Sequence, residues 1–189
     1  MKIYVSPYMF IDKNNSLNYS IENSYFKYIF ELGFQPVLLD PLNINRIDVN
    51  NTSCLFLTGA GNINSVEKNK SNKTRDKIDL NTYNFFISKN IPIISICRSS
   101  QLLLTKIYKL EIYKNKEHVR KSHIIKNNKK KINVNSFHNF SIKGSNKKLS
   151  ELYIHSDNSI EMAKDLRRRT LIMMFHPERK NIDQKKINS

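Results

Sequence analysis

The segment IPIISICRSSQ, residues 91–101, begins with the strongest strand signal of the chain and then changes abruptly to polar residues. Its first six residues include four isoleucines, which is typical of a strand. The residues that follow, 98–110, are predicted as a helix. The segment therefore predicts a strand joined to a helix, with Cys97 at the turn between them.

Strands and helices alternate in the residues before this segment. Residues 16–32 repeat apolar side chains at helical spacing, and Gly33 follows as a candidate helix-ending residue in the left-handed conformation. A second helix is expected at 75–89, after a polar connection at 67–74. The expected strands are 2–5, 36–39 and 54–57. This alternation predicts an α/β fold with a doubly wound, flavodoxin-like, mostly parallel sheet, whose strand carboxyl ends share one edge where sites form.

Beyond residue 112 the pattern changes to short strands separated by polar turns. The expected strands are 132–137, 152–155, 160–163 and 170–175. They predict an antiparallel extension of the parallel sheet. We expect residues 1–180 to form a single domain and residues 181–189 to form a C-terminal tail.

The composition excludes several classes of protein. A chain of 189 residues with 39% hydrophobic side chains can bury a core and is not wholly disordered. Two cysteines exclude a disulfide-framed module and a multi-cysteine zinc finger. No apolar run approaches the roughly 20 residues that span a bilayer, and the first ten residues lack a signal-peptide pattern. We therefore expect a cytoplasmic protein without membrane contact.

The chain has 32 Lys+Arg against 16 Asp+Glu, which gives a formal charge of +16. Such an excess is typical of proteins that bind nucleic acid. The basic residues are spread along the whole chain, however, and Asn and Ile are as abundant as Lys, which favours A/T-rich codon usage as the explanation. We therefore do not expect a nucleic-acid partner, although the basic surface favours an anionic small molecule.

Cys97 is the first candidate catalytic residue. A sharp turn from strand to helix exposes the side chain of its central residue at the positive end of the helix dipole, where a thiolate is stabilised. The turn favours small neighbours two positions before and after, a need that Ser95 and Ser99 only partly meet. The alternative is that Cys97 is a small buried hydrophobic residue at a strand end.

His176 and Glu178 are the next candidates. The segment MMFHPER, residues 173–179, places His176 after an apolar strand and Glu178 two residues further on. In an extended chain the side chains of residues i and i+2 point to the same side, and Pro177 restricts φ between them. Glu178 can therefore orient His176 as the base of a Cys-His-Glu triad with Cys97. A surface histidine beside a surface glutamate is the alternative.

Gly59, Ala60 and Gly61 follow the apolar strand 54–57. A loop of such small residues can direct backbone N–H groups toward a developing oxyanion, and the amide of Arg98 would be the second donor. An ordinary turn between strand and helix is the alternative. No cluster of His, Cys and carboxylate side chains occurs at ligand spacing, so we expect no metal and no cofactor.

Five segments in this order resemble the motifs of class I glutamine amidotransferase-like domains, in the branch that includes γ-glutamyl-γ-aminobutyrate hydrolase (peptidase C26 type). The segments are TGAGN at 58–62, SICRSSQ at 95–101, VNSFH at 134–138, DNSIEMA at 157–163 and FHPER at 175–179. The usual turn around the nucleophile in that family reads GICRGxQ, so serines replace both glycines here.

The resemblance implies a cysteine-dependent hydrolase that cleaves a γ-glutamyl amide and releases glutamate through a thioester intermediate. It implies Cys97 as nucleophile, His176 as acid and base, and Glu178 as the group that orients His176. The segment that would hold the glutamyl moiety, together with Gln101, consists of Asn135, Ser136, Phe137 and His138. Serines in place of the turn glycines would crowd the turn, so a reduced activity or a more open turn is expected.

Within the family, residues 118–120 and 134–140 are most similar to small hydrolases encoded with capsule phosphoramidate enzymes. Those hydrolases remove glutamate from a γ-glutamyl-linked cytidine diphosphate amidate. The resemblance thus implies a small-molecule γ-glutamyl substrate, with an anionic leaving group as one option. Two other functions stay open: a glutaminase subunit that delivers ammonia to a partner synthase, and a catalytically inactive basic binding protein. A homodimer is also compatible with the sequence.

Overall fold

The computed structural model describes residues 1–179, and the expected tail at 181–189 lies outside the described residues. The strands are β1 (Lys2–Val5), β2 (Tyr8–Ile11), β3 (Leu17–Ser20), β4 (Gln35–Leu38), β5 (Thr52–Leu57), β6 (Ile93–Ile96), β7 (Glu111–Lys114), β8 (Val119–Lys126), β9 (Lys131–Phe137), β10 (Phe140–Lys143), β11 (Ser150–Ile154), β12 (Ile160–Asp165) and β13 (Thr170–Met173). The helices are α1 (Asn23–Glu31), α2 (Lys70–Ser88) and α3 (Arg98–Lys106), with 3-10 helices η1 (Pro41–Arg46) and η2 (Lys116–His118).

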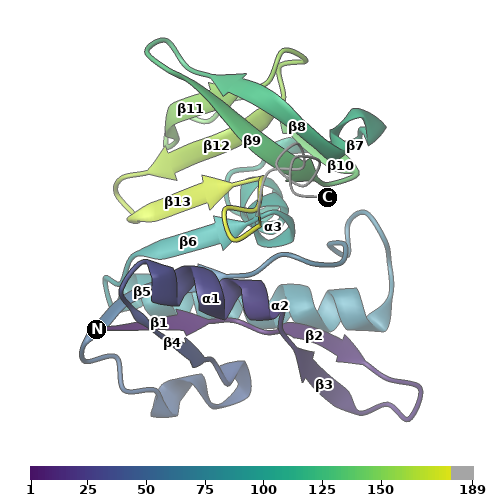
Figure 1. Ribbon diagram of the computed structural model, residues 1–189. Coiled ribbons are helices and arrows are strands. Elements are labelled where there is room, and N and C mark those ends of the chain that lie inside the picture. Colours follow the sequence, from purple (N-terminus) through teal and green to yellow (C-terminus); the bar gives the residue numbers. More distant parts are fainter. Residues whose placement is uncertain (180–189) are drawn as a thin grey trace, which may run out of the picture.

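One large mixed sheet organises the described chain (Figure 1). Its strand order is β4-β1-β5-β6-β13-β12-β11-β8-β9. The first five of these strands pair in parallel, and every pairing from β13 to β9 is antiparallel. The α/β fold class predicted from the sequence, a parallel sheet with an antiparallel extension, is therefore confirmed.

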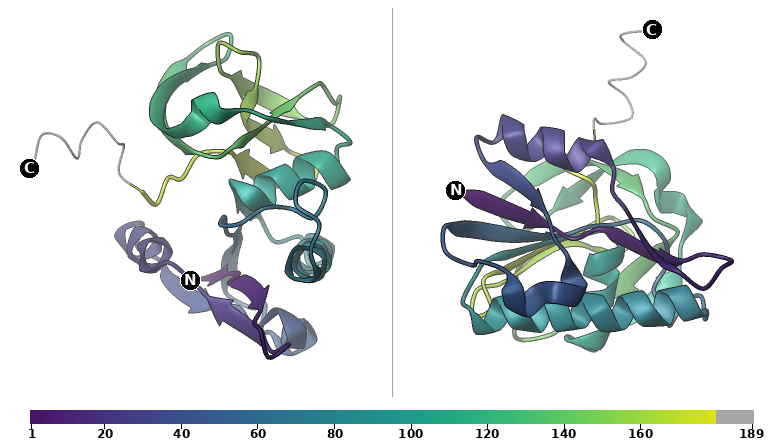
Figure 2. Two further views of the ribbon diagram at one scale, coloured as in Figure 1. Left: turned by 90° about the vertical axis from the view of Figure 1, so that its right-hand side faces the viewer. Right: turned by 90° about the horizontal axis from the view of Figure 1, so that it is seen from below.

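Helices cover both faces of the parallel part of the sheet (Figure 2). Alternate side chains of β5 divide between the two faces: Phe56 packs in the cluster that contains Tyr25 and Ile29 of α1. Leu55 and Leu57 belong to the larger cluster, which also contains side chains of α2 and α3. Burying an apolar side chain of this size contributes about 1.5–3 kcal/mol, so this strand anchors both helical layers.

A hairpin occupies part of the region in which the sequence pattern predicts one long helix. Strands β2 and β3 pair in antiparallel register, with Tyr8 opposite Ser20 and Ile11 opposite Leu17. The carboxylate of Asp12 accepts hydrogen bonds from backbone amides within the turn, including that of Ser16. The helix predicted at 16–32 therefore begins only at Asn23, and the prediction was wrong at 16–22, because an apolar pattern over four residues cannot distinguish strand from helix.

The second helix starts five residues before the predicted position. Asn69 caps α2, because its side chain accepts the backbone N–H of Asn72 at 2.7 Å. The helix also buries polar residues along its length, among them Arg75, Asp76 and Asp79. The polar connection predicted at 67–74 thus overlaps the first turn of α2, and the buried charges that follow it face the site described below.

None of the helices in residues 1–179 is long and apolar enough to cross a membrane.

Gly33 ends α1 in the predicted left-handed conformation, with φ of 81° and open space where a Cβ would lie. A Cβ there meets no neighbour, so any effect of substitution comes from the backbone alone. We expect Gly33→Ala to lower the free energy of unfolding by about 1–2 kcal/mol and Tm by roughly 2–8 °C. Gly33→Asn is the matched control and should lose clearly less, because Asn tolerates this conformation. Thermal unfolding followed by circular dichroism checks this, and an unchanged Tm for Gly33→Ala would contradict it.

Candidate active site

Cys97 occupies a strained turn between β6 and α3. Its backbone has φ of 51° and ψ of −106°, a combination that costs a residue with a side chain about 1–3 kcal/mol. Two backbone hydrogen bonds hold the turn: Cys97 N donates to Met173 O at 2.8 Å, and Gln101 N donates to Cys97 O at 2.9 Å. This is the predicted nucleophile position, at the N-terminus of a helix and at the edge of the sheet.

The two serines that replace glycines near Cys97 are accommodated by hydrogen bonds. Ser99 is buried and its hydroxyl donates to Thr58 O at 2.5 Å. Ser95 is also buried, with its hydroxyl 3.1 Å from that of Ser100. Both added side chains thus have polar partners, and Ser99 fastens the turn to the loop that starts at Thr58.

His176 lies beside Cys97 and is bonded to Glu178. His176 Nδ1 is 2.6 Å from Glu178 Oε1, as the i, i+2 spacing predicts. The side-chain amide of Asn135 brackets the backbone of His176: it accepts from His176 N at 2.8 Å and donates to His176 O at 2.7 Å. The ring of Phe137 meets the imidazole edge to face, with centroids 5.7 Å apart. The orientation of His176 is therefore fixed from three sides.

The electrostatic surroundings favour a charged His176. Burial by itself lowers the pKa of the imidazole, but the negative charge and hydrogen bond of Cys97 and those of Glu178 outweigh burial and raise the pKa to about 9. A protonated His176 beside a thiolate is the ion pair from which cysteine nucleophiles act.

Arg75 fixes the orientation of the carbonyl groups in the loop that contains Gly59, Ala60 and Gly61. Its guanidinium, almost fully buried, donates to three successive carbonyls: Thr58 O at 3.3 Å, Gly59 O at 2.8 Å and Ala60 O at 2.5 Å. Ala60 and Gly61 both have positive φ, of 72° and 71°. Because the carbonyls are held on the side of Arg75, the loop can present backbone N–H groups on the other side.

One backbone amide of this loop, that of Gly59, is hydrogen-bonded to Tyr25. Gly59 N donates to the hydroxyl of Tyr25 at 3.0 Å, so this N–H is already paired. A Cβ on Gly59 would lie 2.9 Å from Cε1 of His176 and 3.3 Å from Cβ of Cys97. The role of Gly59 is therefore to allow close approach of the loop to both residues. Burial, followed by the charge of Glu178, raises the pKa of Tyr25 well above its usual value.

The side chain of Arg98 points away from the cavity into a buried ion network. It pairs with Asp76 and, at 2.5 Å, with Asp79, which also lies 3.4 Å from Arg75 Nε. Two arginines and two aspartates balance their charges there. Any oxyanion contact from Arg98 must therefore come from its backbone amide, as the sequence predicts.

A cavity of about 270 Å³ adjoins Cys97. The predicted site residues among its lining are Ala60, Gly61, Cys97, Gln101, Phe137, His138 and His176. Asn135 and Ser136 are buried behind the cavity rather than lining it: Ser136 donates to His118 O at 2.6 Å. The Gln101 amide donates to Phe140 O at 2.9 Å.

Sequence reasoning missed four residues that also line the cavity: Asn62, Asn139, Phe140 and Arg179. Arg179 is held by Glu22, with Nε to Oε2 at 3.2 Å, and its guanidinium lies 4.9 Å from the ring centroid of Phe137. Its position directly after Glu178 was the available signal. Tyr25 and Arg75 gave none, because the backbone groups that they contact lie 15 or more residues away along the chain.

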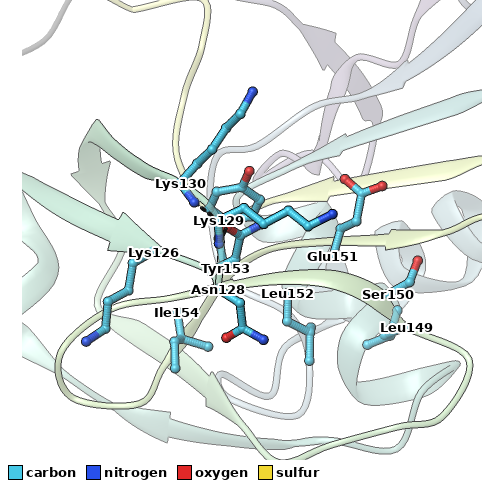
Figure 3. A pocket seen from close by; sticks show the side chains of 11 residues that line it. Lys126, Asn128, Lys129, Lys130, Leu149, Ser150, Glu151, Leu152, Tyr153 and Ile154 are labelled. Carbon is cyan, nitrogen blue, oxygen red and sulfur yellow. Dashed lines mark hydrogen bonds between the residues drawn. The ribbon is translucent and has the colours of Figure 1, made fainter.

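A larger hollow of about 860 Å³ lies elsewhere, over the β8–β9 turn and β11 (Figure 3). Lys126, Lys129 and Lys130 line it together with Glu151 and Tyr153. It contains none of the triad candidates, so we place the chemistry in the smaller cavity.

The architecture described above is that of class I glutamine amidotransferase-like proteins. A candidate GMP synthase component from Thermoplasma acidophilum matches with a TM-score of 0.71 at 15% identity, over 96% of this chain and 86% of that one. A glutamine amidotransferase from Thermotoga maritima matches with a TM-score of 0.64 at 15% identity, over 94% of this chain and 76% of that one.

The profile of the peptidase C26 family matches residues 9–178, and the chain belongs to this family. Gamma-glutamyl-CDP-amidate hydrolase of Campylobacter jejuni subsp. jejuni serotype O:2 is 27% identical over 165 residues, which are 87% of this chain and 70% of that protein. The family and this relative point to γ-glutamyl amide hydrolysis or a glutamine amidotransferase-like activity.

Replacing Cys97 by Ala should lower the pKa of His176 from about 9, because both the charge and the hydrogen bond of Cys97 raise it. The raised pKa also stabilises the fold: the contribution is complete below the ordinary pKa of 6.5 and is lost as pH rises through about 9. Titration of the histidine ring nitrogens by NMR in both proteins measures the shift. Equal His176 pKa values in the two proteins would contradict the proposed pair.

Proposed function

We propose that this protein hydrolyses a γ-glutamyl amide and releases glutamate through a thioester on Cys97. The observation that carries the proposal is the arrangement around one cavity: a strained cysteine at a helix N-terminus, an adjacent histidine paired with Glu178, and a loop with its carbonyls turned away. These are the nucleophile, base, orienting group and oxyanion donors that acyl transfer requires.

In the first step the Cys97 thiolate attacks the γ-carbonyl carbon of the substrate. The carbonyl oxygen becomes an oxyanion, which the backbone amides of Arg98 and of the loop at 60–61 stabilise. Protonated His176 gives its proton to the departing nitrogen, the C–N bond breaks, and the amine leaves. The glutamyl group remains on Cys97 as a thioester.

In the second step a water molecule attacks the thioester carbonyl. His176, now neutral, accepts a proton from this water while Glu178 stabilises the imidazolium that forms. The C–S bond breaks, glutamate leaves, and the thiolate and protonated His176 are restored. All of these groups belong to one chain.

The leaving group that we favour is an anionic amidate. Arg179 supplies a guanidinium on the cavity wall, and the formal charge of the chain is +16. Nε and Nη2 of Arg179 donate to the half-exposed carboxylate of Glu22, so a phosphate group would bind through the remaining N–H groups or by displacing Glu22. The Campylobacter relative, whose name describes a γ-glutamyl-CDP-amidate hydrolase, supports the same choice.

Glutamate release from γ-glutamyl nucleotide amidates, γ-glutamyl amines and glutamine tests the function. We expect Cys97→Ala to remove activity by about 10⁴-fold or more, since loss of a nucleophile disables the whole triad. Cys54→Ala is the matched control: Cys54 is buried outside the cavity lining, burial raises the pKa of its thiol to about 12, and its variant should stay active.

The same assay separates the other functions. A glutaminase subunit would act on glutamine alone and become faster when its synthase is added. An electrophilic glutamine analogue should label Cys97 in either enzyme, and the absence of both labelling and turnover would leave only the inactive binding protein. Full activity of Cys97→Ala would refute the mechanism.

Arg75→Lys tests the loop. Lysine keeps the positive charge beside Asp79 but cannot bind three carbonyls at once, so the loop amides lose their fixed direction. We expect kcat to fall about 10–100-fold with a smaller change in KM. Arg169→Lys is the control, because Arg169 also donates to a backbone carbonyl, that of Asn90, outside the cavity lining. Equal kcat values for Arg75→Lys and the unmodified protein would show that the loop needs no such support.

A further inference from the structure

Four of the five histidines gather at a second place in the molecule. His118 ends η2, His123 lies on β8, His138 follows β9 and His155 follows β11. The ring centroid of His118 lies 4.7 Å from that of His123 and 4.9 Å from those of His138 and His155. Only His176 belongs to the triad. The strands β8, β9 and β11, which carry or precede three of these histidines, belong to the antiparallel part of the sheet (Figure 1).

Three of these imidazoles have a ring nitrogen that is buried without a hydrogen-bond partner: His118 Nδ1, His123 Nε2 and His155 Nδ1. The side chain of His118 is fully buried and that of His123 is 9% exposed. Each of these nitrogens faces a carboxylate oxygen: Glu161 Oε1 at 3.2 Å for His118, Glu161 Oε2 at 3.4 Å for His123 and Asp157 Oδ1 at 3.2 Å for His155. The cluster therefore gathers nitrogen and carboxylate ligands in one buried place. When such a nitrogen is deprotonated it offers a lone pair, and a transition-metal cation can replace the protons of all three rings at once.

The spacing of the three side chains suits a metal ion. His118, His123 and His155 each offer one ligand atom, and these atoms all lie within 4.8 Å of one another. Zn²⁺ binds imidazole nitrogen at about 2.0–2.1 Å, which sets tetrahedral ligand atoms about 3.3 Å apart. Small rotations of the three side chains would bring their ligand atoms from the present separations to those of a zinc site.

Two carboxylates complete the surroundings. Asp157 Oδ2 lies 2.8 Å from His118 Nε2, the ring nitrogen opposite the unpaired one. This carboxylate–histidine contact orients metal-binding imidazoles in many proteins. Glu161 is fully buried, with Oε1 3.2 Å from His118 Nδ1 and Oε2 3.4 Å from His123 Nε2. Its Oε2 also lies 3.4 Å from His138 Nε2, and its charge lies between these imidazoles, where it can serve as a fourth ligand.

A route for the ion is present. A surface cavity of about 560 Å³ is lined by His123 and His155, with Tyr113, Lys121 and Asp157 among its other residues. None of His118, His123 and His155 lines the cavity at Cys97. His138, the fourth histidine of the cluster, does line that cavity, so the cluster and the cavity adjoin each other there. An ion held by His118, His123 and His155 would join η2, β8 and the β11–β12 connection.

We propose that His118, His123 and His155 bind a divalent transition-metal ion, with Zn²⁺ the best fit, that Glu161 is its fourth ligand, and that Asp157 orients His118. The site is structural. No local sequence pattern marks it, because His155 lies far from the other two along the chain and the residues meet only after the antiparallel strands have formed. The expectation of no metal rested on that missing spacing.

The test uses full-length, untagged protein carrying Cys97→Ala, which removes the triad thiol as a competing ligand. After treatment with a chelator and dialysis, Zn²⁺ is titrated in competition with a fluorescent zinc indicator, and bound metal is counted by mass spectrometry. We expect about one equivalent of Zn²⁺ and a Tm higher by about 5–10 °C at an ion concentration 100 times Kd.

Variants assign the ligands. His123→Gln and His155→Gln, whose side chains reach the surface cavity, should each weaken binding by about 100-fold or more, and Asp157→Asn by about 10–100-fold. His176→Gln is the matched control and should keep the full equivalent. Circular dichroism checks that each variant is folded.

Three results would overturn the proposal. The first is less than one tenth of an equivalent bound with no change in Tm. The second is loss of metal in His176→Gln with retention in His123→Gln and His155→Gln, which would place the ion at the triad. The third is loss only in His138→Gln and Glu161→Gln, which would assign a different ligand set around His118.

Discussion

The hydrogen bonds from Arg75 to three successive carbonyls are the constraint on which the rest of the site depends. They fix the loop after β5 against α2, and the charge that makes them strong is balanced by Asp79, which also holds Arg98 at the start of α3. One buried network thus fixes three segments at once: the loop, the long helix and the helix that follows Cys97. Removing one partner would leave an unpaired buried charge, which costs about 3–5 kcal/mol, so the parts cannot drift independently.

Sheet topology supplies the second half of the site. β6 and β13 are parallel neighbours, with Ile96 opposite Met173, so the residues that follow each strand emerge at the same edge. Cys97 follows Ile96 directly, and its amide is bonded to Met173 O. The pairing therefore brings Cys97 and His176 together although they are far apart in the sequence. On its other side β13 pairs with β12, which carries Glu161. The strand that precedes His176 is thus the direct neighbour of the strand that carries the carboxylate beside the histidine cluster.

Much of this arrangement follows from local sequence. The apolar run before Cys97 and the i, i+2 spacing of His176 and Glu178 are short-range signals, and both predict features that the structure contains. Arg75 and Tyr25 could not be found in the same way. Their partners are backbone groups far away in the sequence, and no local pattern of residues indicates such a contact. The sequence pattern missed the β2–β3 hairpin for a different reason, because four residues are too few to distinguish the period of a strand from that of a helix. What escaped prediction is the set of long-range polar contacts.

The hydroxyl of Ser99 donates to Thr58 O, a carbonyl that Arg75 also contacts. The side chain that replaces a glycine has become part of the support for the loop. Residue 99 and the loop conformation are therefore coupled, and a glycine introduced there would remove a bond instead of restoring a lost feature. A motif search that counts Ser99 only as a missing glycine would rank this chain too low, because the motif describes the backbone of the turn and not the ways in which a side chain can hold it.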